Sequence, residues 1–217
     1  MCPPRNGETP PESCATRATS GEHGESRCAR RSLGIFWKLR HVKANLATMS
    51  EDLLIGVLGN QKSGKTETWN ALFGRTVHIG KRLRPLWLTD TEYVDVFLVS
   101  GSSEERNKYV GDLITVKHPR IVLCSFQYRE GVSESFSYFS EREYFLFVQW
   151  LNPGYSDRAA GSDLLGLIPL LLAEESLLSM RNGKCDVESR VREIREFISG
   201  WAGPRGLIQT AGQTQLV

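Results

Sequence analysis

Short apolar runs alternate with segments of helical spacing along residues 53–201 of this chain. Several runs are apolar on both faces, as in a sheet covered by helices on each side. They predict β-strands at 53–58, 85–88, 93–99, 120–126 and 144–151. Apolar positions three and four residues apart predict helices at 65–73, 103–114, 132–140, 162–180 and 187–201. This alternation predicts an α/β fold, namely a three-layer α/β/α sandwich with a mostly parallel sheet.

The last predicted helix shows the helical pattern most clearly. Val187, Val191, Ile194 and Ile198 share one face, and charged residues occupy the rest of the helix. We expect the apolar face to dock on the domain and the charged face to be solvated.

The N-terminal part of the chain differs from the rest in composition. Residues 1–31 are rich in Pro, Gly, Ser, Glu and Arg and have almost no large apolar side chain. Such a segment cannot bury enough surface to offset the entropy of ordering it. We therefore expect a disordered basic arm at 1–48, a folded domain at 49–205 and a flexible tail at 206–217. Met49 directly precedes the folded part, so the arm could lie upstream of the natural start.

Within the arm, residues 33–46 mix apolar and basic side chains. Leu39, Val42 and Leu46 recur at helical spacing, which predicts a basic amphipathic helix. Such a helix could lie on an anionic membrane or pack on the domain, and the pattern does not favour membrane contact.

Charge and cysteine content narrow the cellular setting. Residues 1–50 carry eight Lys or Arg against four Glu, whereas the remaining residues carry 19 basic against 21 acidic side chains. A slightly acidic body is a poor nucleic-acid surface, although the basic arm could still touch phosphate. The five cysteines form no C-x-x-C pair, as expected of free thiols in a reducing cytosol. Because the chain has neither an apolar leader nor an 18-residue apolar run, we expect a cytoplasmic protein.

One eight-residue stretch fits the pattern G-x-x-x-x-G-K-[ST] between the first predicted strand and the first predicted helix. Its residues are Gly59, Asn60, Gln61, Lys62, Ser63, Gly64, Lys65 and Thr66. In this context the pattern predicts a loop that binds a nucleotide's phosphates at a helix N-terminus, with Glu67 beside it. Lys65 would reach the β- and γ-phosphates and stabilise charge on the transferred phosphoryl group, and the Thr66 hydroxyl would ligate Mg²⁺.

Residues 59–75 resemble the phosphate loop and first helix of translation-factor-like GTPases, both Era-like and dynamin-like. The helix ends in Asn70-Ala71-Leu72-Phe73-Gly74, as it does in both branches. Residues 80–86 are similar to the dynamin-like first switch leading into its strand. The resemblance implies a P-loop NTPase fold that binds GTP with Mg²⁺ and hydrolyses the β–γ phosphate bond.

Three family motifs depart from the expected pattern. Arg82 stands where the resemblance implies the switch threonine, with Thr76 and Thr89 as the nearest hydroxyls. The Asp-x-x-Gly motif falls on 98–101, which has Gly101 but no aspartate. The guanine-reading loop falls on 151–157, which offers Asn152 and Asp157 at a different spacing. We expect these two residues to contact the base, which favours GTP and leaves ATP open.

The missing aspartate requires another Mg²⁺ ligand. Asp95, inside the predicted strand 93–99, is the metal residue that we assign, with Asp90, Ser100 and Glu104 as alternatives. Ser102 or Ser103 would instead cap a helix.

Two other residues each allow two interpretations. Gln127 either orients a water molecule or is a surface loop residue. Tyr155 either stacks on a base or belongs to a plain turn. The four histidines form no ligand spacing.

The leading hypothesis is a GTPase-like NTPase with slow intrinsic hydrolysis, in which Arg75 and Arg82 are the candidates for an arginine finger. The alternatives are an ATP-binding P-loop protein or small-molecule kinase, and a non-hydrolysing adaptor that binds a protein partner through its switch loops.

Overall fold

A computed structural model describes residues 50–174 and 176–212 of the chain. The predicted arm at 1–48, its amphipathic segment 33–46 and the end of the predicted tail lie outside the described residues. Among the residues described, no helix is both long and apolar enough to cross a membrane.

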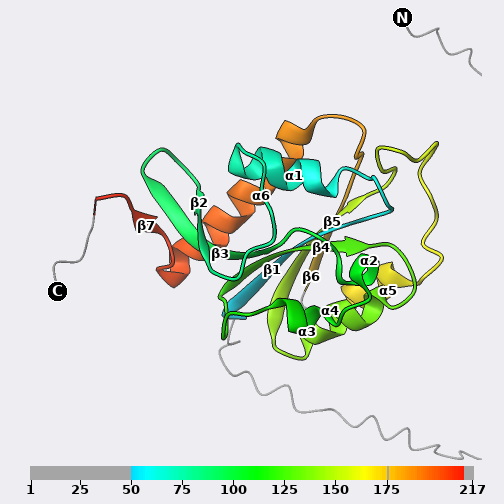
Figure 1. Ribbon diagram of the computed structural model, residues 1–217, viewed down its shortest axis with the longest axis horizontal. Helices are drawn as coiled ribbons and strands as arrows, with labels where there is room; N and C mark the ends of the chain where they lie inside the picture. The colour runs from blue at the N-terminus through cyan, green and yellow to red at the C-terminus, as the bar shows by residue number, and fades with distance from the viewer. Residues whose placement is uncertain (1–49, 175, 213–217) are drawn as a thin grey trace, which may run out of the picture. The chain divides into compact units, whose positions relative to one another are not determined.

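The described chain contains a seven-stranded sheet, and helices connect most of its strands along the sequence (Figure 1). The elements are β1 (Asp52–Gly59), α1 (Lys65–Phe73), β2 (Arg84–Trp87), β3 (Glu92–Val99), α2 (Ser103–Arg106), α3 (Val110–Leu113), β4 (Ile121–Gln127), α4 (Val132–Ser140), β5 (Tyr144–Leu151), α5 (Leu167–Leu172), β6 (Ser176–Arg181), α6 (Val187–Ala202), the 3₁₀ helix η1 (Gly203–Arg205) and β7 (Gln209–Thr210). The strand order is β2-β3-β4-β1-β5-β6. Only β2 and β7 run antiparallel, and both pair with β3.

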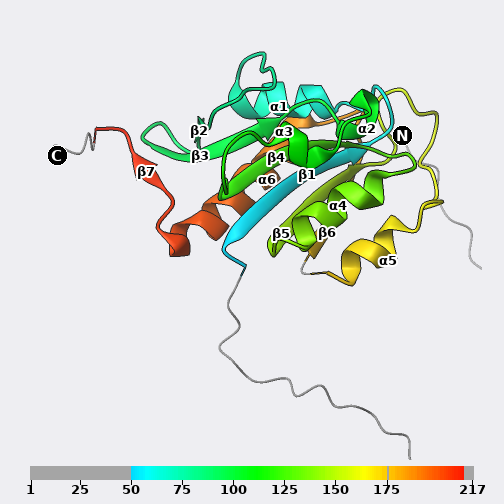
Figure 2. The same cartoon turned by 60° about the horizontal axis from the view of Figure 1, so that its bottom comes forward.

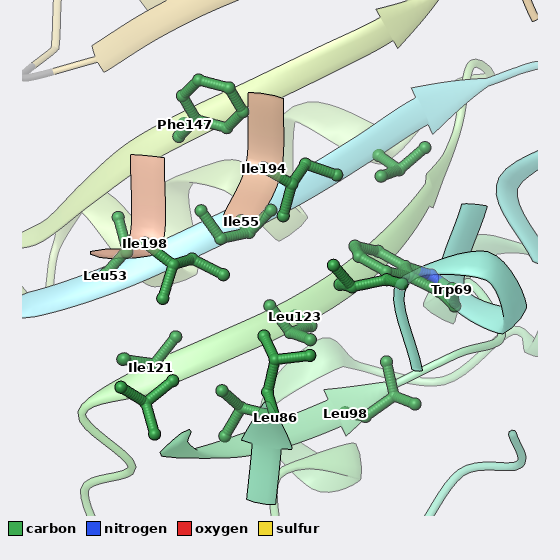
Figure 3. Packing of buried hydrophobic residues seen from close by; sticks show 14 of the residues in the cluster. Leu53, Ile55, Trp69, Leu86, Leu98, Ile121, Leu123, Phe147, Ile194 and Ile198 are labelled. Carbon is green, nitrogen blue, oxygen red and sulfur yellow. The ribbon is translucent and has the colours of Figure 1, made fainter. Parts of the chain in front are cut away.

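Helices cover both faces of the sheet, as the two views show (Figures 1 and 2). On one face, alternate residues of β1 such as Leu53 and Ile55 pack with α1 and α6 through Trp69, Ile194 and Ile198 (Figure 3). On the other face, the intervening β1 residues pack with α3, α4 and α5. The expected α/β class with a mostly parallel sheet is therefore confirmed, and the arrangement is compatible with three layers.

All five predicted strands are present, each within one residue of its predicted ends. The predicted helix 162–180 is wrong over most of its length, because α5 spans only Leu167–Leu172 and β6 follows it. Gly166 adopts a positive φ of 65° just before α5, so a glycine turn separates the helix from the preceding loop. The leucine-rich sequence that continues into β6 fits a helix and a buried strand equally well by pattern alone.

Two further differences concern the segment after β3 and the C-terminal tail. The predicted helix 103–114 is divided into α2 and α3, because Asn107 takes a left-handed conformation with φ 47°. In the predicted tail 206–217, Gln209 and Thr210 form β7 and pair with β3.

The phosphate-loop strand β1 lies between β4 and β5. Its last residue, Gly59, is paired with Gln127 of β4 on one side and with Leu151 of β5 on the other. β3 is one strand further away. Since ligands of such sheets bind at the carboxyl ends of the parallel strands, the candidate site lies beyond the end of β1, where the segment after β3 and the loop after β5 also reach.

Candidate functional site

The loop between β1 and α1 has the geometry expected of a phosphate-binding loop. Gly64 is the N-cap of α1 with φ 102°, a conformation that L side chains rarely adopt. The Lys65 side chain curls back along the loop and donates from Nζ to the carbonyl oxygens of Gly59 at 3.0 Å and Asn60 at 2.8 Å. The lysine ammonium thus lies inside the loop, where a bound phosphate would meet it.

Burial sets the electrostatics of Lys65. Only 7% of the residue is exposed. Removal from water lowers the pKa of its ammonium group, whereas the negative charges of Glu105, Glu104 and Asp157 oppose this shift. A phosphate group would favour the charged form in the same way as these acids.

A cavity of about 460 Å³ opens over the loop. Its lining residues are Lys62, Ser63, Gly64, Lys65, Thr66, Glu67, Ser100, Gly101, Ser102, Glu105 and Tyr155. Five predicted phosphate-loop residues and Glu67 therefore line one cavity. The segment after β3 and Tyr155 from the loop after β5 complete it.

The turns after β5 and β6 pack against the back of the phosphate loop. The Tyr155 and Ser156 amides donate to the carbonyl oxygens of Ser63 and Lys62, each at 3.2 Å. The Gly183 amide donates to the Pro153 carbonyl oxygen at 2.8 Å. Ser63 is 1% exposed, and a Cβ added at Gly154 would lie 2.5 Å from its side chain. This close approach requires a residue without a side chain.

Asn152 and Asp157, the two predicted base contacts, form hydrogen bonds within the loop after β5 and to the phosphate loop. Asn152 accepts a hydrogen bond from the Gly161 amide and donates one to the Gly161 carbonyl oxygen, both at 2.7 Å. Asp157 accepts from the Gly154 amide at 2.7 Å and from Asn60 Nδ2 at 3.3 Å. Neither residue lines the cavity.

The structure does not bring Asp95, the predicted metal residue, to Thr66. Asp95 lies four residues before the end of β3, about 13 Å along the strand. It pairs with Pro85 of β2 and accepts a hydrogen bond from Gln209 at 2.9 Å. Asp90 lies beyond the opposite end of β3, in the turn after β2.

The alternative metal residues are placed closer to the cavity. Ser100 lines it. Glu104 is 9% exposed and faces α4, where it accepts hydrogen bonds from Ser103, from Ser135 and from the Gln127 amide. The Glu104 carboxylate therefore joins α2, α4 and the end of β4.

Sequence reasoning missed two charged residues of the site. Glu105 lines the cavity with Thr66. Arg190 on α6 is 2% exposed, although the charged face of this helix was expected to be solvated. Its Nη1 donates to the carbonyl oxygens of Asn182 at 3.0 Å and Cys185 at 2.7 Å. The only sequence signal for Glu105 was its place in the loop after β3, and Arg190 had none.

Arg190 brings positive charge behind the phosphate loop. Its Nη2 lies 3.6 Å from the position of a Cβ at Gly64. Nε and Nη2 have no hydrogen-bond partner among the described residues. Burial lowers the pKa of this guanidinium, and Glu67 is the first acid that opposes the shift. An arginine keeps its charge even so, because its reference pKa is far above neutrality.

A buried hydrogen-bond chain joins α1 to the cavity segment after β3. Trp69 Nε1 donates to Ser125 Oγ at 2.7 Å, and Ser125 Oγ donates to the Ser100 carbonyl oxygen at 3.0 Å. Trp69 and Ser125 are both fully buried. Helix α1 and the segment that begins at Ser100 are thus linked through β4.

In comparisons with protein-family models, curated proteins and solved structures, no match to this chain was found. The assignment of a function therefore depends on the geometry of the site.

Proposed function

We propose that this chain is a P-loop NTPase that binds a nucleoside triphosphate with Mg²⁺ and hydrolyses its β–γ bond slowly, as a GTPase-like switch. The observation that carries the proposal is the buried Lys65 ammonium, held inside a glycine-bounded loop at the N-terminus of α1 and open to a cavity of about 460 Å³. A cavity of this size is in the range of small-molecule sites. The resemblance of residues 59–75 to translation-factor-like GTPases supports the same proposal.

The donor set fits Mg²⁺. The Thr66 hydroxyl and the Glu105 carboxylate line the same cavity and supply oxygen ligands. The described residues contain no group of three or more His, Cys, Asp or Glu that could hold a metal ion by themselves. A magnesium ion in such sites is held by one or two protein ligands together with substrate phosphates and waters. When bound, it would neutralise charge on the β- and γ-oxygens.

The protein groups have separate roles in this proposal. Lys65 binds the β- and γ-phosphates, and the amides at the start of α1 donate to phosphate oxygens. Arg190 adds a positive charge behind Gly64 without reaching the cavity.

Neither arginine-finger candidate lines the cavity. Arg75 lines a different one, beyond the C-terminal end of α1. Arg82 lies in the exposed connection before β2. Without an arginine at the phosphates, intrinsic turnover would be slow.

The non-hydrolysing adaptor stays open as a second candidate, because the sequence has no aspartate and no threonine at the positions where the resemblance places the switch residues. Single-turnover hydrolysis with GTP and ATP, compared with equilibrium binding, distinguishes an NTPase from this adaptor. A phosphate transferred to an added small molecule would instead favour the kinase.

The decisive experiment is a binding titration with GTP, GDP, ATP and ADP in Mg²⁺, on the wild type and on Lys65→Ala. We expect the substitution to weaken triphosphate binding by about 10-fold to 100-fold, as for loss of a charged hydrogen bond. Lys81→Ala removes an exposed lysine outside the cavity and is the matched control. A folded Lys65→Ala variant with wild-type affinity would overturn the proposal.

A further inference from the structure

One aromatic ring lines the cavity beside the phosphate loop. Apart from the loop and Glu67, the lining residues are Ser100, Gly101, Ser102, Glu105 and Tyr155. Tyr155 is 63% exposed. Its backbone is fixed to the phosphate loop by the hydrogen bond from its amide to the Ser63 carbonyl oxygen. Residue Tyr155 is therefore attached to the phosphate loop where it lines the cavity.

The two residues that the sequence predicts to contact the base are already engaged. The Asp157 carboxylate accepts from the Gly154 amide and from Asn60, and both side-chain ends of Asn152 bond to Gly161. Turning Asp157 toward a guanine would leave the Gly154 amide and the Asn60 amide group without their acceptor. Loss of such bonds has a cost comparable to the gain from reading the base.

We propose that the site holds its nucleobase by stacking on Tyr155 and discriminates little between guanine and adenine. This inference rests on the proposed function and gives the substrate class as nucleoside triphosphates in general. Every base offers a π-face, so stacking tolerates different bases, whereas strong discrimination requires polar groups that a wrong base would leave unpaired. The phosphates then supply the common anchor and the ring supplies the contact to the base.

The test is equilibrium binding of the Mg²⁺ complexes of GTP, ATP and inorganic tripolyphosphate to the full chain and three variants. In the wild type we expect GTP and ATP affinities to differ by less than fivefold. Tyr155→Ala should weaken both nucleotides by about fivefold or more and leave tripolyphosphate unchanged, because only the nucleotides have a base to stack. Tyr155→Phe keeps the ring and should retain nucleotide affinity.

The third variant, Asp157→Asn, tests the carboxylate separately. It should change the GTP and ATP affinities by the same factor, because the side chain acts on the loop and not on the base. A GTP preference of fivefold or more, or a smaller loss in Tyr155→Ala, would overturn the stacking inference alone. If neither tripolyphosphate nor the nucleotides bind the wild type, the proposed function fails together with it.

Discussion

The two walls of the cavity are built in different ways. The first wall consists of the phosphate loop 59–66 backed by the turns 152–157 and 182–185, and backbone hydrogen bonds and glycine contacts hold it. The second wall is the segment 100–106. Its fixed points are the Ser125 hydrogen bond to the Ser100 carbonyl oxygen, the Glu104 carboxylate and a Ser102 cap at 3.4 Å.

This difference indicates which wall can respond to a ligand. Moving the first wall would break several backbone hydrogen bonds at once, so it would offer the phosphates of the proposed ligand a preformed site. The second wall ends in α2, a helix of only four residues that is too short to be stable alone. In the proposed function, a bound triphosphate would shift the second wall, and Glu105 with it, if they contact the metal and the phosphates.

Gly183→Ala should have the largest effect, because the added methyl group would push the turn 182–185 away from the phosphate loop. A Cβ at this position would come closer than 3.0 Å to the Ser63 carbonyl oxygen, which is backbone and cannot turn away. We expect a loss of about 1–3 kcal/mol of unfolding free energy, the usual range for overpacking. Thermal unfolding should show a melting temperature lower by about 2–12 °C, with weaker triphosphate binding.

Gly200→Ala is the matched control for Gly183→Ala. Gly200 is an exposed residue of α6, and a Cβ there would meet nothing within 4 Å. Alanine should stabilise the helix by about 0.5–1 kcal/mol. Equal melting temperatures for Gly183→Ala and the wild type would show that the first wall adjusts to the added methyl group without loss of stability.

Ser125→Ala removes the anchor of the second wall. It leaves the buried Trp69 N–H without an acceptor and the Ser100 carbonyl oxygen without its donor. We expect a loss of about 1–3 kcal/mol in urea unfolding. Amide hydrogen exchange should become faster in 100–106 but not in 152–157.

A double-mutant cycle with Trp69→Phe tests the hydrogen-bond chain directly. Because Trp69→Phe and Ser125→Ala each break the same bond, the double variant should lose less than the two single losses together, by about 0.5 kcal/mol or more. Strict additivity, or uniform acceleration of exchange in both walls, would contradict the chain as the anchor.

Glu105→Gln should have a smaller effect, confined to the metal. The substitution keeps the shape of an exposed side chain and removes its charge, so the melting temperature should not change. We expect the affinity for Mn²⁺ in the presence of triphosphate, measured by electron paramagnetic resonance, to fall by about tenfold. Glu141→Gln, in an exposed residue at the end of α4, should leave it unchanged. Unchanged affinity in Glu105→Gln would remove Glu105 from the metal site.

The first wall could be predicted from sequence further than the second. The glycines and Lys65 form a local pattern of eight residues, and the strand and helix around them follow from apolar periodicity. The positions of Asp157 and Arg190 depend on where distant turns pack, so their actual contacts could not be read from spacing. Asp95 was assigned by its place along a strand, whereas its distance from the carboxyl end of β3 keeps it from the cavity.

The secondary structure, like the site, could be predicted where local pattern decides and not where distant contacts decide. Strands with apolar residues on both faces were found within one residue, whereas β6 has the leucine content of a helix and is defined by its pairing with β5. Whether such a segment forms a strand or a helix depends on pairing with a strand that is distant in sequence.

Removing residues 1–48 should have the smallest effect, because the described contacts of the chain's start begin at Ser50. Arg205 donates to the Ser50 carbonyl oxygen, and Arg120 forms ion pairs with Glu51 and Asp52. All of these contacts stay in a chain that begins at Met49, so the melting temperature and the triphosphate affinity should match those of the full chain. A chain that begins at Leu53 is the matched control, since it loses these contacts and should melt lower. If only the chain that begins at Leu53 is less stable than the full chain, the arm 1–48 stabilises neither wall. A lower melting temperature in the chain that begins at Met49 would instead show that the arm packs on the domain. Faster amide exchange in 100–106 of that chain would show that the arm contacts the second wall.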